Sequence, residues 1–525
     1  MTADASASTA GRTIVNLPGS KRIPWPGAQK VGTPRMDEVV DLTVWLRPRH
    51  GGELDAARAH TLSTLAPRER TYLSRKELRE AAAADSADVD RLSAFLARHK
   101  IHVVEVVWRS VIVRGTLAAL ASAFGATLEL YVDPEGRQFR QRSGTMSLPR
   151  DVAEVVHGVF GFNEWPRAHS MRPNASAVEN PTPHPPLLAN AVARDYAFPP
   201  DADGSGQTIA ILQFGGTFNR ADYEACMKLN GVKAGEVLTK RVDGADDIRR
   251  GETEFDTELA LDTQIAGGLA PGARLVLYTA PHSERGFLDV IRTVLFDDEF
   301  QPSILSISYG WPEGFWTNAA LEIFDDLFAA AALLGVSVFA SSGDSGADDF
   351  DGKPHVRSPA SSRFAHACGG THAEMVDGAI VSENAWNRTG GGFSTREAPP
   401  WQTNIHEQAE VSSGKGGRGV PDIAAQVIPG YRIVRDGVPT AAGGTSTVAP
   451  LWAALTARLN QALGVPIGFY APLLYDLAAK GTLFRKIERG SNGVYHVRKG
   501  WNPCTGLGSP VGTAILEALR GPAAG

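Results

Sequence analysis

The chain has 525 residues, 43% of them hydrophobic and 21% charged, which is typical of globular proteins and excludes a chain too polar to bury a core. No run of about 18 apolar residues occurs, so a membrane span is not expected. The formal net charge of −6 conceals an asymmetry: residues 1–170 carry 23 Lys/Arg and 19 Asp/Glu, and the remainder carries 29 and 39. Two parts of opposite charge can attract each other, and the overall balance predicts no nucleic-acid partner.

Residues 1–36 are predicted to be a disordered tail, because they lack periodic apolar residues. They also lack the apolar stretch of a classical signal peptide, so the sequence does not explain any export. Three cysteines, Cys226, Cys368 and Cys504, are widely spaced and odd in number. Each is predicted to be a small buried hydrophobe and not part of a disulfide or zinc framework.

Residues 37–168 are predicted to form a smaller α+β domain with an antiparallel sheet. The domain begins with an alternating apolar strand, "EVVDLTVWLRP", and helical periodicity then gives way to further strands. The predicted helices cover 65–84 and 88–100, and the later strands lie within 101–115 and 125–134.

Residues 169–190 are predicted to be a linker that contains a processing site, because Pro, Asn and Ser displace periodic apolar residues there. From 191 to 525 short apolar strands alternate with helices, which predicts an α/β domain with a parallel sheet covered by helices. Sites in such folds gather at the carboxyl ends of the strands. The predicted strands are 207–214, 273–280, 303–310 and 336–343, and the helices are 220–231, 253–268, 285–298 and 319–335.

The stretch "SSGDSG" contains the letters of a trypsin-type nucleophile motif, but it follows a predicted parallel strand and not a strand of an all-β fold. Ser345 is therefore not expected to be a nucleophile. Ser446 in "GGTSTVAP" is a better candidate, because glycines precede it and a helix follows, with Pro450 in its tolerated first turn. A lone serine at such a position is more often only a helix cap, so a partner base is needed.

A helix over 253–268 offers that base, because Glu254, Glu258 and Asp262 follow one another at intervals of four on one helix face. Acids near a helix start are also favoured by its dipole, which is the plainer interpretation. Two carboxyl groups four residues apart can share a proton, which raises one apparent pKa and orients the other group. The histidines of this region form no paired motif; they are residues 282, 355, 366, 372, 406 and 496.

Together, Glu258 and Asp262 in "TELALDTQIAGGLAPGA", Asp344 in "SSGDSG" and Ser446 in "GGTSTVAP" resemble the sedolisins, the serine-carboxyl peptidases, and most of all their kumamolisin-like members. The resemblance continues through "SILSISYGWPE", "AWNRTGGGFS" and "GWNPCTGLGSP". It implies a subtilisin-like catalytic domain over 191–525 and a ferredoxin-like propeptide (pro-kumamolisin activation domain) over 37–168, made together as a zymogen.

The resemblance assigns a role to each of the four residues. Ser446 becomes the nucleophile, Glu258 its general base and later general acid, Asp262 the group that orients Glu258, and Asp344 the oxyanion-hole donor. A carboxylate base remains partly ionised near pH 4, where an imidazole is protonated, and Asp344 donates only while protonated. The expected activity is that of an acid-acting endopeptidase on protein or peptide substrates, expected to be extracellular and monomeric.

The substrate cleft is expected beside "SISYGW" and "TGGGFS", where an extended peptide can pair with exposed backbone. The candidate substrate-binding residues are Ser308, Tyr309, Gly310, Gly391 and Gly392. The chain also departs from the family here: some relatives extend the acid chain with a Glu and a Trp, where this sequence has Gln213 and Tyr309. An altered pH dependence is expected from this departure, and not a loss of activity.

No cofactor is expected, although calcium is the ion of the family. The positions that correspond to its calcium ligands are Lys486, Ile487, Arg498, Gly500 and Asn502. A hard dication needs anionic oxygens, and an ammonium repels it, so the hypothesis is that Lys486 replaces the ion. Melting or inactivation on chelation, reversed by added calcium, would contradict this hypothesis.

Two other interpretations remain. A subtilisin relative with a histidine base is disfavoured by the absence of a histidine motif, and a catalytically silent binding protein on the same fold is disfavoured by the four intact residues. The propeptide is expected to be an intramolecular inhibitor that docks near neutrality through opposite charge and loosens in acid. Persistence of the intact chain in acid would argue against that expectation.

Overall fold

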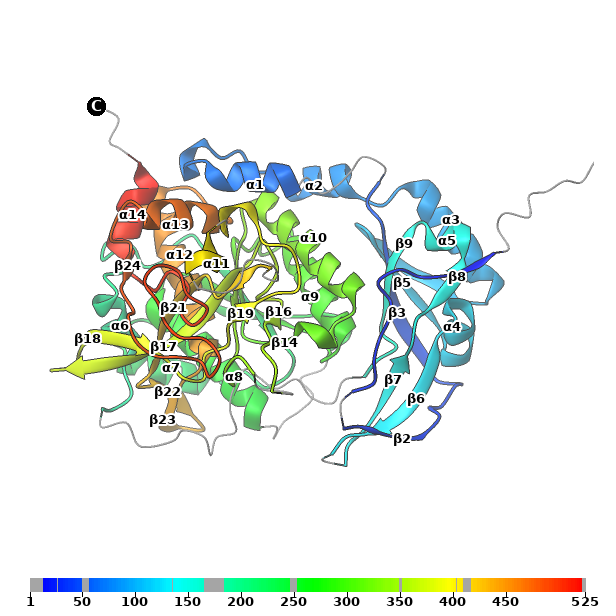
Figure 1. The fold of residues 1–525 in the computed structure, drawn as a ribbon, viewed down its shortest axis with the longest axis horizontal. Coiled ribbons are helices and arrows are strands. Elements are labelled where there is room, and N and C mark those ends of the chain that lie inside the picture. Colours follow the sequence, from blue (N-terminus) through cyan, green and yellow to red (C-terminus); the bar gives the residue numbers. More distant parts are fainter. Residues whose placement is uncertain are drawn as a thin grey trace, which may run out of the picture.

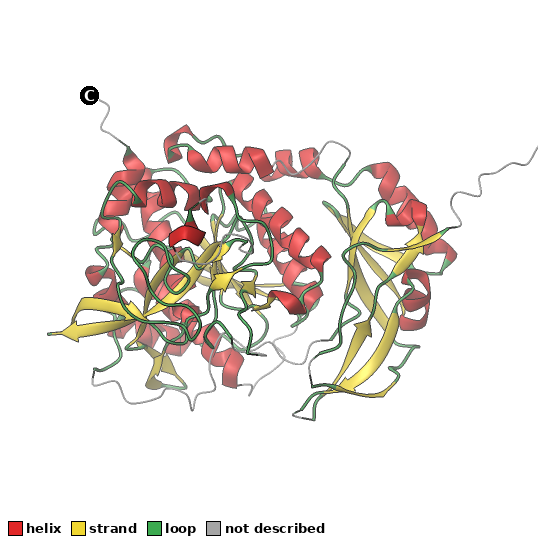
Figure 2. Cartoon of the chain, viewed as in Figure 1, coloured by secondary structure: helices red, strands yellow, loops and turns green. Residues whose placement is uncertain are grey.

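The computed structural model describes residues 13–25, 27–49, 56–134, 136–164, 184–245, 253–348, 352–402, 404–408 and 417–521. These residues form two units with separate sheets (Figures 1 and 2). The N-terminal unit comprises residues 13–164 and the C-terminal unit residues 184–521. None of the described helices is long and apolar enough to cross a membrane.

The C-terminal unit is built around an eight-stranded sheet with the order β11-β12-β10-β13-β15-β17-β18, in which β21 also pairs with β17. The pairs are parallel except for β17 with β18. The strands are β10 (Thr208–Gln213), β11 (Val237–Arg241), β12 (Arg274–Thr279), β13 (Ile304–Ile307), β15 (Ser337–Ser341), β17 (His366–Val376), β18 (Ala379–Ala385) and β21 (Ile423–Ile428).

Helices cover both faces of this sheet, as the alternation along β10 illustrates. Ala210 and Leu212 point into one hydrophobic core, and Ile209 and Ile211 into the other. The first core is closed by α9 (Glu284–Leu295) and α10 (Asn318–Leu334). The second is closed by α6 (Ala189–Asp195), α7 (Arg220–Leu229), α8 (Thr253–Leu269) and α12 (Val448–Leu463).

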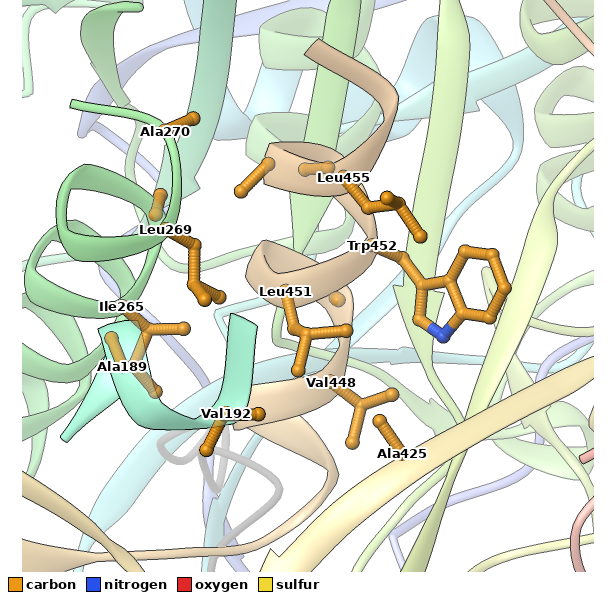
Figure 3. Close-up of a cluster of buried hydrophobic side chains, with 14 of the residues drawn as sticks. Ala189, Val192, Ile265, Leu269, Ala270, Ala425, Val448, Leu451, Trp452 and Leu455 are labelled. Carbon is orange, nitrogen blue, oxygen red and sulfur yellow. The ribbon is translucent and has the colours of Figure 1, made fainter. Parts of the chain in front are cut away.

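The helix α12 runs through the centre of the second core. Figure 3 shows Leu451 pointing toward α8 and α6, while Trp452 points away from them. The indole nitrogen of Trp452 donates to the Ala424 carbonyl at 3.1 Å. This buried packing on two sides fixes the start of α12, directly after the turn that carries Ser446.

Smaller elements complete the unit: β14 (Trp311–Pro312), β16 (Arg357–Ser358), β19 (Gly392–Phe393), β20 (Gly419–Val420), β22 (Tyr431–Arg435), β23 (Val438–Ala442), β24 (Phe484–Arg485), β25 (Ser509–Pro510), α11 (Ile405–Gln408), α13 (Ala471–Ala478) and α14 (Gly512–Arg520).

The N-terminal unit contains a four-stranded antiparallel sheet with the order β4-β5-β3-β9. The chain order is strand, helix, strand, strand, helix, strand, as in ferredoxin-like folds, and this confirms the predicted α+β domain. Asp85 caps one of the helices and Thr116 the other, each through its side-chain oxygen. The elements are β3 (Val39–Leu46), α3 (Ser86–Arg98), β4 (His102–Val107), β5 (Ser110–Thr116), α4 (Leu117–Phe124) and β9 (Val156–Phe160).

The predicted disordered tail is corrected from residue 13 onward, where the chain takes part in a two-stranded sheet and a three-stranded sheet. From residue 13 onward the tail belongs to the N-terminal unit, because β1 (Ile14–Asn16) pairs with β8 (Ser147–Pro149) and β2 (Gln29–Gly32) pairs with β6. Neither β1 nor β2 contains a buried residue, so neither strand leaves an apolar pattern in the sequence. The remaining strands of this region are β6 (Thr127–Val132) and β7 (Gln138–Ser143), followed by the short helix α5 (Arg150–Ala153).

The helix predicted over 65–84 is also corrected. A single 3₁₀ turn covers Pro67–Glu69, the chain is extended over 70–74, and α2 spans Arg75–Ala82. Ser74 starts α2 with a capping box, in which its hydroxyl accepts from the Glu77 amide and the Glu77 carboxylate accepts from the Ser74 amide. Together with α1 (Ala56–Thr64), this segment lies along the C-terminal unit, away from the four-stranded sheet (Figure 1).

Candidate active site

The turn that carries Ser446 is held in place by a close contact with Asp344. Residues Thr445–Thr447 form a 3₁₀ turn that leads into α12, and Ser446 is fully buried. The preceding Gly444 has a φ of 99°, and a Cβ there would lie 2.1 Å from the Asp344 carboxyl oxygen Oδ2. Only glycine fits both the conformation and the contact. The glycine-rich approach predicted before Ser446 is therefore confirmed in structure.

Glu258 and Asp262 lie one helical turn apart on α8, and their side chains are 0% and 1% exposed. The helix α8 contacts the 3₁₀ turn of Ser446 directly. Burying two carboxyl groups in a protein core costs free energy unless they share protons or accept hydrogen bonds. These two acids therefore do not lie on an exposed, solvated helix face, which would have explained them without a function. Glu254, one turn earlier, is only partly buried.

Both oxygens of Asp262 accept hydrogen bonds. The Ser308 hydroxyl donates to Oδ1 at 2.7 Å, and the Gln213 amide nitrogen donates to Oδ2 at 2.9 Å. The Tyr309 hydroxyl donates to the Gln213 amide oxygen at 3.0 Å, which turns the amide nitrogen toward Asp262. All of these side chains are buried, so the orientation of Asp262 is fixed by hydrogen bonds on both sides.

Two of the candidate substrate-binding residues also have side chains in this acid cluster. The Ser308 side chain contacts Asp262 and lies 3.4 Å from the Ser446 carbonyl oxygen, and Tyr309 contacts Gln213. Their side chains belong to the acid cluster, while their backbone remains a candidate for pairing with a peptide. Gly391 and Gly392 lie at the pairing of β19 with β20, and the Gly310 carbonyl oxygen is 3.5 Å from the Arg357 guanidinium.

Asp344 follows β15, at the carboxyl end of a parallel strand, and is fully buried. Its Oδ1 accepts two hydrogen bonds from Thr445, one from the amide at 2.7 Å and one from the hydroxyl at 2.6 Å. The other oxygen, Oδ2, lies against Gly444, on the side of the Ser446 turn. A proton on Asp344 therefore belongs on Oδ2. Ser345, in contrast, is exposed to solvent.

The sequence does not indicate the roles of two further residues of the site. Thr445 orients Asp344, but its neighbours suggest only a helix start. Arg357 is buried, and burial lowers the pKa of its guanidinium to about 10 while the charge of Asp344 acts in the opposite direction. A buried cation within electrostatic reach of Asp344 opposes the protonation of that carboxyl group. The sequence does not indicate either role, because each residue acts on Asp344 from a position more than ten residues away in the chain.

Among the histidines of the C-terminal unit whose side chains are described, His366 alone is buried. Its Nε2 accepts from the Tyr470 amide at 3.3 Å, and its Nδ1 faces the Val338 carbonyl oxygen at 3.0 Å. Burial lowers the pKa of His366 to about 3, so the ring stays neutral in the core. Both ring nitrogens are thus engaged away from Ser446, which leaves His366 unsuited to act as its base.

The positions of the family calcium site do not fit a calcium ion. Lys486 and Arg498 are exposed, and Ile487 is buried. The Asn502 side-chain oxygen accepts from the amides of Cys504 and Thr505, both at 3.0 Å, so it is occupied by a local turn. The described residues contain no cluster of three or more His, Cys, Asp or Glu side chains that could hold a metal ion. All three cysteines are buried and free, as expected.

Comparison with known proteins agrees with this geometry. Residues 26–165 match the family described as "Pro-kumamolisin, activation domain". The chain is 37% identical to kumamolisin from Bacillus sp. (strain MN-32), with 96% of each chain covered. It is 28% identical to sedolisin from Pseudomonas sp. (strain 101), covering 83% of this chain and 80% of sedolisin.

A solved structure also matches: Pseudomonas sedolisin, a serine-carboxyl proteinase complexed with two molecules of pseudo-iodotyrostatin. The TM-score is 0.57 at 27% identity, and the match covers 64% of this chain and 98% of that structure. The subtilisin-like parallel sheet with helices is therefore confirmed as the fold of the C-terminal unit. The identity over nearly the whole length, the activation domain and this fold agree, and the chain belongs to the kumamolisin and sedolisin family of serine-type peptidases, made with an N-terminal propeptide.

Proposed function

We propose that this protein is an acid-acting endopeptidase in which Ser446 is the nucleophile, Glu258 the general base, Asp262 its orienting partner and Asp344 the oxyanion-hole donor. The observation that carries the proposal is the burial of Glu258 and Asp262 on one face of α8, in contact with the turn of Ser446. The fixed position of Asp344 beside Gly444 supports the fourth role.

In the proposed reaction, the Ser446 hydroxyl attacks the carbonyl carbon of the scissile peptide bond and its proton passes to Glu258. The negative charge that develops on the carbonyl oxygen is stabilised by a hydrogen bond that protonated Asp344 donates from Oδ2. Glu258 then gives the proton to the leaving amine, which departs and leaves an acyl-enzyme. Water, deprotonated by Glu258, hydrolyses this ester and restores the Ser446 hydroxyl.

The proposed chemistry selects acid for two reasons. A carboxylate base keeps part of its charge near pH 4. Asp344 must be protonated to donate, while the buried Arg357 guanidinium favours its ionised form, so a high proton concentration is needed to overcome that preference. Activity is therefore expected to rise as Glu258 ionises and to fall as Asp344 loses its proton.

The experiment that tests this function is a pH profile of protein cleavage. The processed enzyme, incubated with a denatured protein substrate between pH 3 and pH 8, is expected to give a bell-shaped kcat/KM with its maximum below pH 6. Cleavage should fall about tenfold per pH unit on the alkaline side. A maximum near pH 8 would indicate a histidine base, and no cleavage at any pH would indicate a silent binding protein.

The buried amide of Gln213 yields a further prediction. An amide cannot share a proton with Asp262, whereas a carboxyl group at this position can, and it adds an acid to the cluster. Gln213→Glu is expected to retain activity within about tenfold while the acid limb of the profile moves by at least half a pH unit. Tyr309→Phe removes the hydroxyl that orients the amide and serves as a matched, charge-neutral control. An unchanged profile in Gln213→Glu would exclude coupling between this position and Asp262.

The N-terminal unit is proposed to inhibit the peptidase within the same chain. Its four-stranded sheet packs on α9 and α10 through Trp45, Trp108 and Phe160. A cavity of about 920 Å³ separates the two units at the carboxyl ends of β10 and β12, and residues of both units, Glu164 among them, line it. Glu164, the last described residue of the N-terminal unit, thus lies at the end of the sheet where the proposed site is.

The contact between the sheet and the helices contains groups that lose their charge in acid. His157 donates from Nε2 to Glu322 at 2.8 Å, and the buried Arg109 pairs with Asp326 at 2.7 Å. The hydrogen bond from His157 lowers the pKa of Glu322 from its usual 4.5. A lowered pKa means that this contact stabilises docking above about pH 4.5 and that its contribution is lost as the pH falls through the docked pKa. Acid is therefore proposed to loosen the sheet and expose the linker to cleavage.

An extracellular location and a monomeric state remain proposals, supported by the family relationship alone. The proposal for the metal is that folding of this chain needs no calcium ion, because neither exposed cation of the family site is a possible ligand.

A further inference from the structure

The N-terminal unit also touches the C-terminal unit through a second element, which approaches the four-stranded sheet at its C-terminal end, where Phe296 contacts both Trp108 and the Arg79 guanidinium. Residues 56–82, which we call the arm, comprise α1, the 3₁₀ turn and α2, and lie along α10 and α13 (Figure 1). Ala59, Leu78 and Ala82 of the arm are buried in the same core cluster as Leu333 and Phe469. The arm is thus packed against the peptidase as a core element and not as a loose connection.

The polar anchor of the arm is Arg70, which is 8% exposed. Its guanidinium donates to carbonyl oxygens of both units: Nη1 to Phe469 at 2.7 Å and also to Ile467, Nη2 to Ser63 at 2.8 Å and Nε to Leu65 at 3.0 Å. All four of these hydrogen bonds end on backbone carbonyls. A guanidinium bonded in this way is a strong, geometrically specific contact.

Tyr72 supplies the second part of the anchor. Its hydroxyl donates to the Ile467 carbonyl at 2.6 Å, and its ring fills a notch made by two glycines. A Cβ on Gly335 or Gly468 would lie 2.8 or 2.7 Å from the tyrosine, so the notch requires glycine at both positions. The Leu73 amide then donates to the Leu333 carbonyl at 2.9 Å, which continues the contact along the extended segment.

The anchor differs from the sheet contact in its response to acid. Burial lowers the pKa of Arg70 from 12.5 and raises that of Tyr72 from 10.0, and neither group changes charge between pH 3 and pH 7. Backbone carbonyls do not titrate in this range. The four-stranded sheet, in contrast, contacts carboxylates of the peptidase: the Thr43 hydroxyl donates to Asp289 at 2.7 Å, and His157 donates to Glu322 at 2.8 Å. Arg22, which precedes this sheet in the chain, adds an ion pair with Glu284.

Other titratable groups that face the arm are few and lie at its ends. His60 stacks on Trp401, and burial lowers its pKa, so its protonation in acid weakens that end. Arg79 pairs with Asp298 at 2.7 Å, close to Asp297, while Arg75 donates to the Pro302 carbonyl at 2.8 Å. Asp476 and Lys480 of the neighbouring α13 region pair with each other and are largely exposed.

We propose that the arm is a second docking element, which binds its own notch on the peptidase. In acid, the arm keeps the propeptide attached after the four-stranded sheet has dissociated from the peptidase. The notch formed by Gly335, Gly468 and the carbonyls of Ile467 and Phe469 is then a site on the peptidase that recognises an Arg-x-Tyr segment and lies apart from Ser446. Acid treatment consequently frees the cleft while the propeptide stays tethered.

The test uses the full chain with Ser446→Ala and a recognition sequence for a site-specific endoprotease inserted between residues 169 and 183. After cutting at pH 7, size-exclusion chromatography at pH 7 and pH 4 reports whether the propeptide fragment co-elutes with the peptidase. Co-elution is expected at both pH values. With Arg70→Ala and Tyr72→Phe combined, co-elution is expected at pH 7, and the dissociation constant at pH 4 is expected to rise on the order of 100-fold.

Arg68→Ala is the matched control, because it removes an equal charge from an exposed position two residues earlier and is expected to change nothing. Tyr72→Phe alone, which removes one hydroxyl, keeps the test valid where the double variant does not fold, and an intermediate rise is expected. Dissociation of the parent complex at pH 4, or full retention by folded arm variants at pH 4, would overturn the proposal. Docking needs no catalysis, whereas self-cleavage that continues in the Ser446→Ala chain would contradict the proposed nucleophile instead.

Discussion

Replacing Ser446 by alanine is expected to lower kcat/KM for peptide-bond cleavage by at least about 10⁴-fold at every pH between 3 and 8. The hydroxyl is the proposed attacking group, and alanine fits the fully buried position without adding volume. The fold should therefore survive while the acyl-enzyme cannot form. Cleavage of a denatured protein by the processed enzyme, quantified by the appearance of new amino termini, measures the loss.

The matched control for this variant is Ser345→Ala, at the other serine that a sequence motif suggests. Ser345 is exposed in the turn after β15, whereas its neighbour Asp344 points into the site. Its replacement is expected to leave kcat/KM within twofold of the parent. Equal losses in both variants, or activity retained in Ser446→Ala, would remove Ser446 from the proposed role.

Glu258→Gln is expected to produce the second large effect, a fall in kcat of about 10⁴-fold near the pH optimum. Glutamine has the same size and can still form hydrogen bonds in the buried site, but it cannot take the proton from Ser446. The loss should be in kcat, with KM nearly unchanged, because a proton acceptor acts in the transition state and not in substrate binding. Steady-state kinetics with a peptide substrate separates the two parameters.

Glu254→Gln makes an equivalent change one helical turn earlier on α8, at a partly exposed side chain. This control is expected to keep parental kinetics, since Glu254 lies outside the proposed cluster. Substantial activity in Glu258→Gln that falls with the titration of a histidine would contradict a carboxylate base. It would point instead to the subtilisin-type alternative.

Much of the fold of the C-terminal unit could be predicted from the sequence, because its strands and helices are long, apolar and regularly spaced. The helix at 253–268 agrees with α8, and the strand expected at 207–214 contains β10. The N-terminal strands β1 and β2 could not be predicted in this way. They bury no side chains and are stabilised by backbone pairing to partners about 100 residues away.

The residues that the sequence singled out for the site are Ser446, Glu258, Asp262 and Asp344, and the structure buries all four. The partners of these residues could not be predicted. The sequence did not indicate that the Ser308 hydroxyl contacts Asp262, that Thr445 binds Asp344, or that Arg357 is buried within electrostatic reach of Asp344. Such roles depend on which strand ends lie side by side, and no local pattern in the chain records that.

The sequence by itself determined the family, because the motifs around Glu258, Asp262, Asp344 and Ser446 resemble those of the sedolisins. Only the tertiary structure decided how Asp262 is oriented, which oxygen of Asp344 is available for a proton, and where Arg70 and Tyr72 bind. Orientation and protonation follow from burial and from donors that are distant in sequence, and these exist only once the sheet and its helices have packed.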